Sequence, residues 1–452
     1  MTELGQYADS LEQLARRLGL DYYDVDFEVA PASLMTEIAV YGLPVRMPHW
    51  SFGVRYIHQL VRQSMGHSKI FEVMFPGDPC RAFLMDGNSL ADNTLVTAHV
   101  LGHADFSKNN ALFARFHAMA GGNIVEHAAA HAQRIQQAID AVGLEKVEAV
   151  LDAALALESH VDVGGELHRE RYAEFAPERK QPLENAFQRR FRSLPGAPEP
   201  LRQEPGPVRA AIPPHPEFDL LWFIAHYAPE LEQWERDIFL MVRAESLYFY
   251  PVFACQIMNE GWASYWHARL LREADFLPQP LYVAALKSHS DVVRPYAAGQ
   301  ETALAINPYH LGFTLWEHVV DKHGMARARE VMQEEDDFGF IRNFLDRELA
   351  DKLDLFVYEA SSGDEIKVLN RDLDAIREAI LAPKFNYGAP RVAVTELRND
   401  GSLDLKHEHA SDGRGLDLGR AKRVLEYTRR VWRRPVRLHT VNERGEPSEL
   451  SA

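Results

Sequence analysis

The chain has 452 residues, enough for two or three domains, and its content of 46% apolar and 25% charged residues is typical of folded globular proteins. Forty-nine lysines and arginines against 66 aspartates and glutamates give a net charge of −17, which argues against binding to nucleic acid or anionic lipid. Two cysteines cannot form a disulfide framework, and the sequence shows neither a secretory signal nor an apolar run long enough for a membrane span. We therefore expect a cytoplasmic protein without a membrane span.

Helical periodicity dominates the first two thirds of the sequence. The predicted helices cover residues 2–20, two segments within 93–139 that separate at Gly121–Gly122, residues 144–157, and most of 218–335, where Pro251 kinks or divides a helix. Residues 21–30 are expected to be extended. Residues 41–56 mix glycine, proline and aromatic residues, which predicts an irregular packed segment.

The sequence pattern changes after about residue 337, where short segments of alternating apolar and polar residues predict strands. These strands are expected at 353–360, 365–370, 391–398, 402–409 and 435–441, with helices at 372–385 and 418–434. The predicted fold is a mainly α N-terminal part, compatible with a zincin-like arrangement of helices, and a small C-terminal α+β domain. The expected divisions are a helical region 1–193, a proline-rich linker or surface excursion 194–216, a helical region 217–336 that packs with the first as one domain, and the α+β domain 337–452.

The first chemical motif is His99-Val-Leu-Gly-His103 on a predicted helix. Histidines four residues apart lie on one helix face, about 6 Å apart along the axis, so both imidazoles can reach one divalent ion. Hydrogen-bonded helix histidines are the alternative, since 20 histidines give about one such pair by chance and a second pair, His127 and His131, is present. Hydrolytic zinc helices carry a glutamate after the first histidine, whereas here that position is Val100.

The second motif is the helical segment that contains Glu260 and His267, seven residues apart and on one face. It is similar to the NEG(F/W)A helix of gluzincin aminopeptidases, whose glutamate is the third zinc ligand, and this similarity implies a ligand role for Glu260. A buried glutamate that ties helices together is the alternative. Glu245 could add a carboxylate to the site only if the helix breaks near Pro251, and pairing with an arginine is its alternative role.

Several ordered blocks of the sequence carry a wider resemblance. They are YGLPVRMPHWSFG (41–53), DPCRAFLMDGNSLADNTLVTAHVLGHADFSKNN (78–110), HAQRI around His131, WERDIFLMVRAESLYFYP (234–251), IMNEGWASYWH (257–267) and NPYHLGF (307–313). Together they resemble the stage V sporulation protein R (SpoVR) family. The resemblance implies a cytoplasmic protein connected with the spore peptidoglycan cortex or with stress and stationary-phase physiology, and it implies no particular reaction.

Other residues in these blocks have both a functional and a structural interpretation. His49 and His131 could be further ligands or substrate contacts, although packed histidines are more common. Cys80 is expected to be a buried thiol, and Tyr309 could polarise an oxyanion or simply follow a helix start at Asn307-Pro308. The basic run 420–437 is expected to be a solvated helix face, with a docking patch for an acidic partner as the alternative.

Two functional hypotheses follow. In the first, the protein is a zinc-dependent hydrolase of peptidase or amidase type that acts on a peptide-like substrate. His99, His103 and Glu260 then bind the divalent ion, and Glu245, His267 or Tyr309 transfers protons or stabilises an oxyanion. In the second, it is a regulatory or scaffold protein that acts through protein partners bound by its C-terminal domain, an alternative that Val100 favours.

Overall fold

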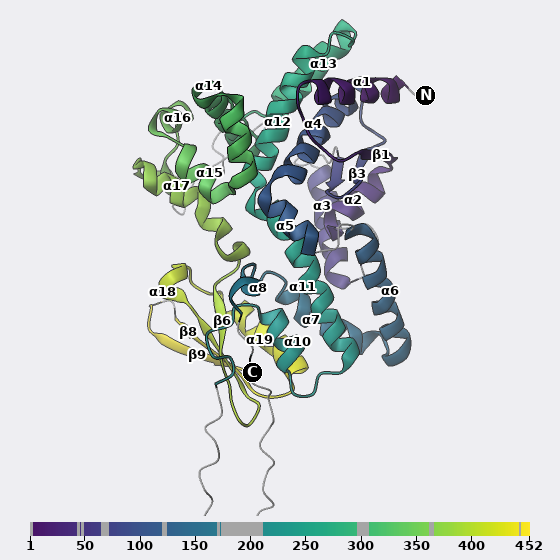
Figure 1. Cartoon of the computed structure of the whole chain (residues 1–452). Coiled ribbons are helices and arrows are strands. Elements are labelled where there is room, and N and C mark those ends of the chain that lie inside the picture. Colours follow the sequence, from purple (N-terminus) through teal and green to yellow (C-terminus); the bar gives the residue numbers. More distant parts are fainter. Residues whose placement is uncertain are drawn as a thin grey trace, which may run out of the picture. The chain divides into compact units, whose positions relative to one another are not determined.

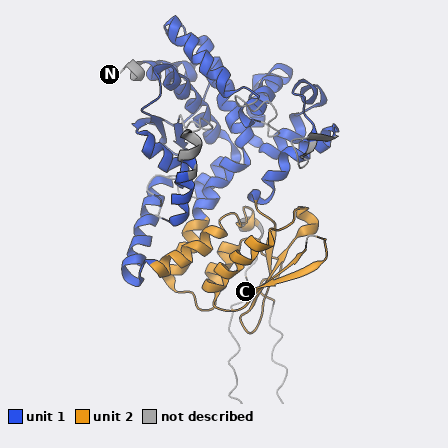
Figure 2. Cartoon of the chain, turned by 180° about the vertical axis from the view of Figure 1, so that it is seen from behind, with its two compact units in different colours: residues 1–144, 244–388 blue, residues 145–243, 389–452 orange. Residues whose placement is uncertain are grey.

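The computed structural model describes residues 3–42, 46, 49–64, 72–119, 124–169, 172, 211–295, 307–360, 366–442 and 444–452. These residues form two compact units (Figure 2). Unit 1 comprises residues 1–144 and 244–388, and unit 2 comprises residues 145–243 and 389–452. The predicted fold class is confirmed, because the chain is mainly α-helical with a small C-terminal α+β part.

Unit 1 contains most of the helices (Figure 1). They are α1 (Glu3–Arg17), α2 (Ala32–Tyr41), α3 (Trp50–Ser64), α4 (Leu90–Asn109), α5 (Ala111–Met119), α6 (Ile124–Val142), α12 (Gln256–Glu273), α13 (Gln279–Val292), α14 (Pro308–Glu334), α15 (Asp337–Phe344), α16 (Arg347–Lys352) and α17 (Leu373–Leu381), followed by a 3₁₀ segment (Ala382–Gly388). A sheet of order β1-β3-β2 combines a parallel and an antiparallel pair, and β4 and β5 form an antiparallel hairpin. The strands are β1 (Val25–Ala30), β2 (Glu72–Phe75), β3 (Cys80–Met85), β4 (Val357–Ala360) and β5 (Ile366–Asn370).

Unit 2 combines short helices with a four-stranded sheet of order β6-β7-β8-β9. Its elements are α7 (Leu144–Ala156), α8 (Gly165–His168), α10 (Leu220–Tyr227), β6 (Val392–Leu397), β7 (Leu403–His407), α18 (His409–Asp412), α19 (Leu418–Trp432), β8 (Val436–Val441) and β9 (Pro447–Ser451). Strands β7 and β8 are parallel, which requires a crossover connection, and α19 lies in that connection. The sequence did not predict β9.

The boundaries of the units differ from the predicted divisions. Residues 337–388 belong to unit 1, whereas residues 145–243 join the C-terminal sheet in unit 2. An antiparallel bridge joins Glu217 to Val394, and the ring of Phe223 stacks on Trp432 with centroids 6.1 Å apart. Such long-range contacts leave no periodic signal in the sequence. Most of the predicted linker 194–216 lies outside the described residues.

Two local predictions need correction. The segment 41–56 was expected to be irregular, but α3 begins at Trp50, and several residues before it lie outside the description. The segment 93–139 was expected to hold two helices separated at Gly121–Gly122, a position outside the described residues. The described residues of this segment belong to three helices, because α4 ends at Asn109 and α5 follows directly. The side-chain oxygen of Asn110 accepts the backbone N–H groups of Leu112 and Phe113, which caps the start of α5.

Pro251 lies inside α11 (Gln233–Ala254), which ends three residues later. The next helix, α12, leaves at an angle of 60° to α11. By length and apolar content, not one of the described helices could cross a membrane alone, although the bent pair α11 and α12 meets that test jointly.

Helix α12 packs closely against α4 on one side and α14 on the other, and glycines make both approaches possible. A Cβ atom on Gly102 of α4 would lie 2.7 Å from the Cα atom of Ala263 in α12. A Cβ atom on Gly261 of α12 would lie 2.3 Å from the carbonyl carbon of Gly312 in α14. Because neither approach leaves room for a side chain, glycine is required at these positions.

Candidate metal centre

The structure brings together the three side chains predicted to bind a metal ion. His99 and His103 project from α4 and Glu260 projects from α12, and one ligand atom of each lies within 4.8 Å of the others. The Nε2 atoms of both histidines lie 3.6 Å from Oε2 of Glu260. The side chains of His99, His103 and Glu260 are 3%, 13% and 22% exposed, so the cluster is nearly enclosed and Glu260 is its most exposed member.

Two atoms of this cluster have no ordinary hydrogen-bond partner among the described residues. Nε2 of His99 and Oε2 of Glu260 are both buried and unpaired. Leaving such polar atoms buried without a partner costs stability, so each one needs an explanation. Two ligands at about 2.0–2.1 Å from a tetrahedral ion lie roughly 3.4 Å apart, close to the 3.6 Å separation here. The donor atoms therefore fit a shared divalent cation.

Asn259 orients the imidazole of His103. The Nδ1 atom of His103 donates to Oδ1 of Asn259 over 2.9 Å, which leaves the Nε2 lone pair directed toward Glu260. Burial lowers the pKa of His103 to about 4, with a further contribution from neighbouring His99. At neutral pH the ring is therefore uncharged, which is the form that binds metal.

His99 is the first of three histidines whose imidazoles contact one another in series. Its Nδ1 atom lies 2.8 Å from Nδ1 of His267, and Nε2 of His267 lies 2.5 Å from Nδ1 of His289 on α13. Burial lowers the pKa of His289 to about 4 and lowers that of His267 well below its usual value. His267, predicted as a catalytic residue, thus contacts His99, one of the candidate ligands. His289 was missed, because a lone histidine on another helix carries no spacing signal.

Tyr309 and Glu72 complete the surroundings of the cluster. The ring of Tyr309 stacks on His99 with centroids 6.1 Å apart, and its hydroxyl donates a hydrogen bond to Glu260. The charge of Glu260 and burial raise the pKa of Tyr309 well above its usual value, so the hydroxyl keeps its proton. Glu72 of β2 interacts electrostatically with His99 and Glu260, and burial raises its pKa. Glu72 was not predicted, because it is a single acid in a short strand.

The charge state of Glu260 follows from opposing effects. Burial favours the neutral acid, but the adjacent imidazoles of His103 and His99 and the hydroxyl of Tyr309 outweigh it, so the pKa of Glu260 lies below its usual value. At neutral pH the cluster therefore offers the carboxylate of Glu260 and the neutral imidazole of His103.

The N-terminus of α12 is fixed close to Glu260. The carboxylate of Asp337 accepts the backbone N–H groups of Ile257 and Met258 over 3.0 and 2.9 Å. Its charge is balanced by Lys384, whose Nζ atom lies 2.9 Å from Oδ2 of Asp337. Burial nevertheless raises the pKa of Asp337 to about 6. This buried pair holds the first turn of the helix that carries Glu260.

Glu245, the other predicted carboxylate, lies in a separate cluster. Its side chain is fully buried in α11, where Oε2 accepts from Nε of Arg46 over 2.8 Å and Oε1 accepts from Nδ1 of His131 over 3.0 Å. Both oxygens are therefore engaged, and within the described part of the chain Glu245 does not join the group of metal-ligand atoms. This arrangement matches the structural alternative, pairing with an arginine.

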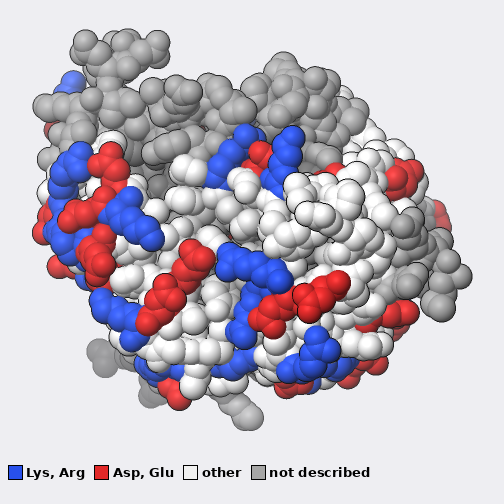
Figure 3. Space-filling model, turned by 90° about the horizontal axis from the view of Figure 1, so that it is seen from above, with Lys and Arg blue, Asp and Glu red and all other residues white. Residues whose placement is uncertain are grey.

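The remaining candidates also have local partners. The Nδ1 atom of His49 lies 2.7 Å from Oγ of Ser51. Burial raises the pKa of the Cys80 thiol to about 11, which makes it a weak nucleophile. In the basic run, Arg437 pairs with Asp404 over 2.8 Å. On the face shown in Figure 3, basic and acidic side chains are interspersed.

Comparison with known proteins places the chain in a family. Residues 1–388 match the family described as SpoVR like protein. The chain is also similar to the uncharacterized protein YcgB of Escherichia coli (strain K12), with 28% identity over 490 residues that cover 98% of this chain and 92% of that protein. The search of solved structures found no match. The chain belongs to the SpoVR-like protein family.

Proposed function

We propose that this protein is a zinc-dependent hydrolase whose ion is held by His99, His103 and Glu260. The observation that carries the proposal is the pair of buried, unpaired atoms, Nε2 of His99 and Oε2 of Glu260, 3.6 Å apart. Two neutral imidazoles and one carboxylate are a donor set of catalytic zinc sites, which leave a further position for water or substrate. A zinc ion in such a set supplies Lewis acidity at that position.

The proton acceptor in this proposal is Glu72. The position after His99, where zinc hydrolases of the HExxH type carry their glutamate, holds the fully buried Val100. Glu72 reaches the same cluster from β2, and its raised pKa brings its titration closer to neutrality, which suits a group that takes up and returns a proton. This assignment replaces the sequence-based suggestion that Glu245 supplies the second carboxylate.

Tyr309 and His267 have supporting roles. Because the hydroxyl of Tyr309 stays protonated and donates to Glu260, it is placed to transfer that single hydrogen bond from the carboxylate to an oxyanion formed beside it. His267 holds the imidazole of His99 in one orientation and tautomer through the bond between their Nδ1 atoms. We therefore assign His267 as a positioning residue.

The proposed substrate is an amide bond in a peptide, including the peptide part of a cell-wall precursor. Support comes from the donor set, which is typical of peptidases, and from the connection of SpoVR-like proteins with the spore cortex that the sequence resemblance implies. The non-catalytic alternative, a regulatory or scaffold protein with a structural ion, predicts the same metal content without turnover.

Metal content tests the site itself. Untagged protein loaded with zinc and dialysed should retain about one ion per chain by elemental analysis, and His103→Ala and Glu260→Gln should lose it. The matched control is His127→Ala, which removes one member of the second histidine pair on α6 and should retain the ion. Wild-type protein that retains no zinc, and whose melting temperature does not change with a chelator, would refute the proposal.

Turnover separates the enzyme from the scaffold. Zinc-loaded wild-type protein is incubated with fluorescein-labelled casein and with purified peptidoglycan, and new amino groups are measured. We expect cleavage of at least one of them, and we expect Glu72→Gln to retain zinc but to lose at least 100-fold in rate, the usual contribution of general base catalysis being about 10²–10⁴. A loaded wild-type protein that cleaves neither probe would favour the scaffold alternative, whereas full activity of Glu72→Gln would contradict the role of Glu72.

A further inference from the structure

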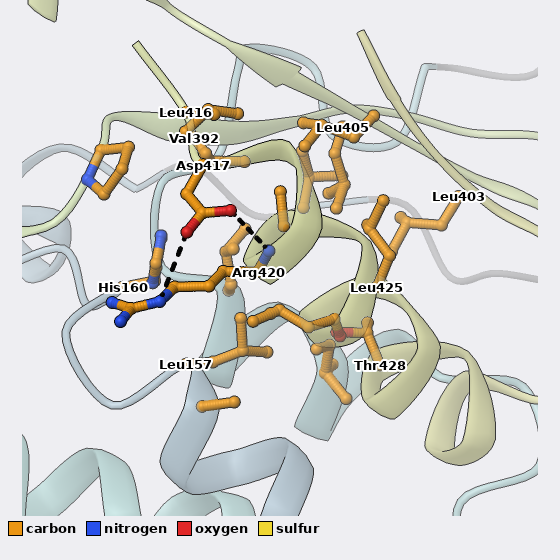
Figure 4. Close-up of a pocket in the computed structure, with 18 residues that line it drawn as sticks. Leu157, His160, Val392, Leu403, Leu405, Leu416, Asp417, Arg420, Leu425 and Thr428 are labelled. Atoms are coloured by element: carbon orange, nitrogen blue, oxygen red, sulfur yellow. Dashed lines mark hydrogen bonds and ion pairs between the residues drawn. The ribbon is translucent and has the colours of Figure 1, made fainter. Parts of the chain in front are cut away.

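Unit 2 contains a cavity of about 310 Å³ that is separate from the metal centre (Figure 4). Its walls come from α7, α10, α19 and the strands β6, β7 and β8, together with the segments that flank them. The lining is almost entirely aliphatic and includes Leu157, Leu220, Val394, Leu403, Leu405 and Leu425. These six side chains are at most 5% exposed, so the floor of the pocket lies in the core of the unit, whereas Asp417 and Arg420 at its rim are exposed to solvent.

Protein interiors normally contain few voids larger than a water molecule. A cavity of this size between a sheet and its covering helix leaves its lining without packing partners and lowers stability. Its volume lies at the lower end of the range of small-molecule pockets, roughly 300–1,000 Å³. A bound apolar molecule would restore the missing contacts.

The two charged groups and the imidazole of the pocket gather at one side, whereas Thr428 lies near Leu425 (Figure 4), where its hydroxyl donates to the carbonyl of Val424. Figure 4 shows His160, Asp417 and Arg420 close together, with Leu403 and Leu425 at the opposite side. The Nδ1 atom of His160 is buried and has no hydrogen-bond partner among the described residues. Burial lowers the pKa of His160 to about 4, so the ring is neutral at neutral pH and can exchange one hydrogen bond with a ligand.

The charges at this side balance each other. Asp417 caps α19 by accepting the backbone N–H of Arg420, and its Oδ2 atom lies 3.4 Å from Nε of the same arginine. A carboxylate ligand would have to compete with Asp417 for Arg420, whereas an uncharged head group can bond to the neutral His160 without breaking that pair. The polar side therefore favours a head group without charge.

We propose that this pocket binds an uncharged amphiphile, a linear aliphatic chain with one hydroxyl head group that bonds to His160. At roughly 30 Å³ for each methyl-sized or water-sized group, the cavity holds about ten non-hydrogen atoms, which corresponds to a chain of about eight to ten carbons. The aliphatic walls contact the chain, and the head lies on the side of Asp417 and Arg420. The ligand is separate from the substrate proposed for the metal centre.

Octan-1-ol is the test probe and octanoate is its charged counterpart. Binding to the full-length protein is followed by saturation-transfer NMR. We expect octan-1-ol to bind at least ten times more tightly than octanoate. Equal or tighter binding of octanoate would overturn the assignment of the head group, and absence of octan-1-ol binding up to its solubility would overturn the pocket as its site.

Two variants locate the binding. Ala421→Phe on α19 fills the cavity and should weaken octan-1-ol binding at least tenfold, whereas Lys422→Phe, an exposed neighbour outside the lining, should leave it unchanged. His160→Phe keeps a ring but removes the nitrogen, and it should weaken binding about threefold to tenfold, the effect of one hydrogen bond. Circular dichroism melting checks that each variant is folded. Unchanged binding in a folded Ala421→Phe, or in a folded His160→Phe, would contradict the proposal.

Discussion

Replacing Gly312 by alanine should disturb the metal centre from a distance. Gly312 lies on α14, three residues after Tyr309, and contacts α12 beside Gly261. An added Cβ atom would lie 2.1 Å from the carbonyl oxygen of Ile257 and 2.8 Å from the Cα atom of Gly261. Both obstacles are backbone atoms, so the clash can be relieved only if the helix that carries Glu260 moves away from the helix that carries Tyr309.

The expected cost can be worked out from these contacts. Overpacking of a core costs about 1–3 kcal/mol, and rigid backbone on both sides places this substitution at or above the upper end. Alanine is favoured over glycine in a helix by about 1 kcal/mol, which offsets part of the loss. We therefore expect the free energy of unfolding to fall by at least about 2 kcal/mol. The shift between Tyr309 and Glu260 should also weaken zinc binding.

Urea unfolding of the metal-free proteins measures the first effect, and competition with a chromogenic chelator measures the second. The matched control is Gly53→Ala on α3, where an added Cβ atom has nothing within 4 Å, and this variant should be as stable as the wild type or slightly more stable. If Gly312→Ala unfolds at the urea concentration of the wild type and binds zinc equally well, the close approach of α12 and α14 does not determine the geometry of the site.

Three further substitutions test the electrostatics of unit 1. Burial lowers the pKa of His117 to about 4, so the unfolded chain binds the extra proton first and stability falls as the pH drops below about 6.5. Between pH 6.5 and 5, His117→Phe should lose about 2 kcal/mol less than the wild type in urea unfolding, and equal losses would contradict this. Asp337→Asn leaves Lys384 without its ion pair and should lower the free energy of unfolding by about 3 kcal/mol, whereas an unchanged value would show that the pair does not hold α12. Glu245→Gln should cost a similar amount, because Arg46 loses its carboxylate partner, but should leave the zinc content unchanged; loss of zinc would return Glu245 to the metal centre.

The sequence predicted those parts of the candidate centre that lie on one element or in a recognisable motif. His99 and His103 share a helix face because they are four residues apart, and Glu260 was identified by its helix motif. Glu72 and His289 reach the cluster from a strand and another helix, and only the tertiary arrangement brings them there. The spacing of residues in the sequence predicts which side chains are neighbours within one helix or strand, whereas contacts between helices and strands depend on how these elements pack.

The prediction of the fold was limited in the same way, because contacts between distant segments could not be predicted. Strands β4 to β8 were predicted from their alternation, but β9 and the position of the unit boundary were not. Residues 144–157 and 218–243 are helical in pattern, like the helices of unit 1, and nothing in their periodicity shows that they fold with the C-terminal sheet. That assignment depends on long-range contacts such as the bridge between Glu217 and Val394.

Glu245 and Glu260 show how the structure distinguishes two glutamates that the sequence alone could not assign to different roles. Glu245 and Glu260 both lie on helices rich in aromatic residues, and from residue type alone either could bind a metal ion. Both oxygens of Glu245 are engaged by a guanidinium and an imidazole, which completes the bonding of a buried carboxylate. Oε2 of Glu260 has no such partner and faces two imidazole nitrogens at 3.6 Å. The deficit of partners, rather than the presence of an acid, is what points to a cation at Glu260.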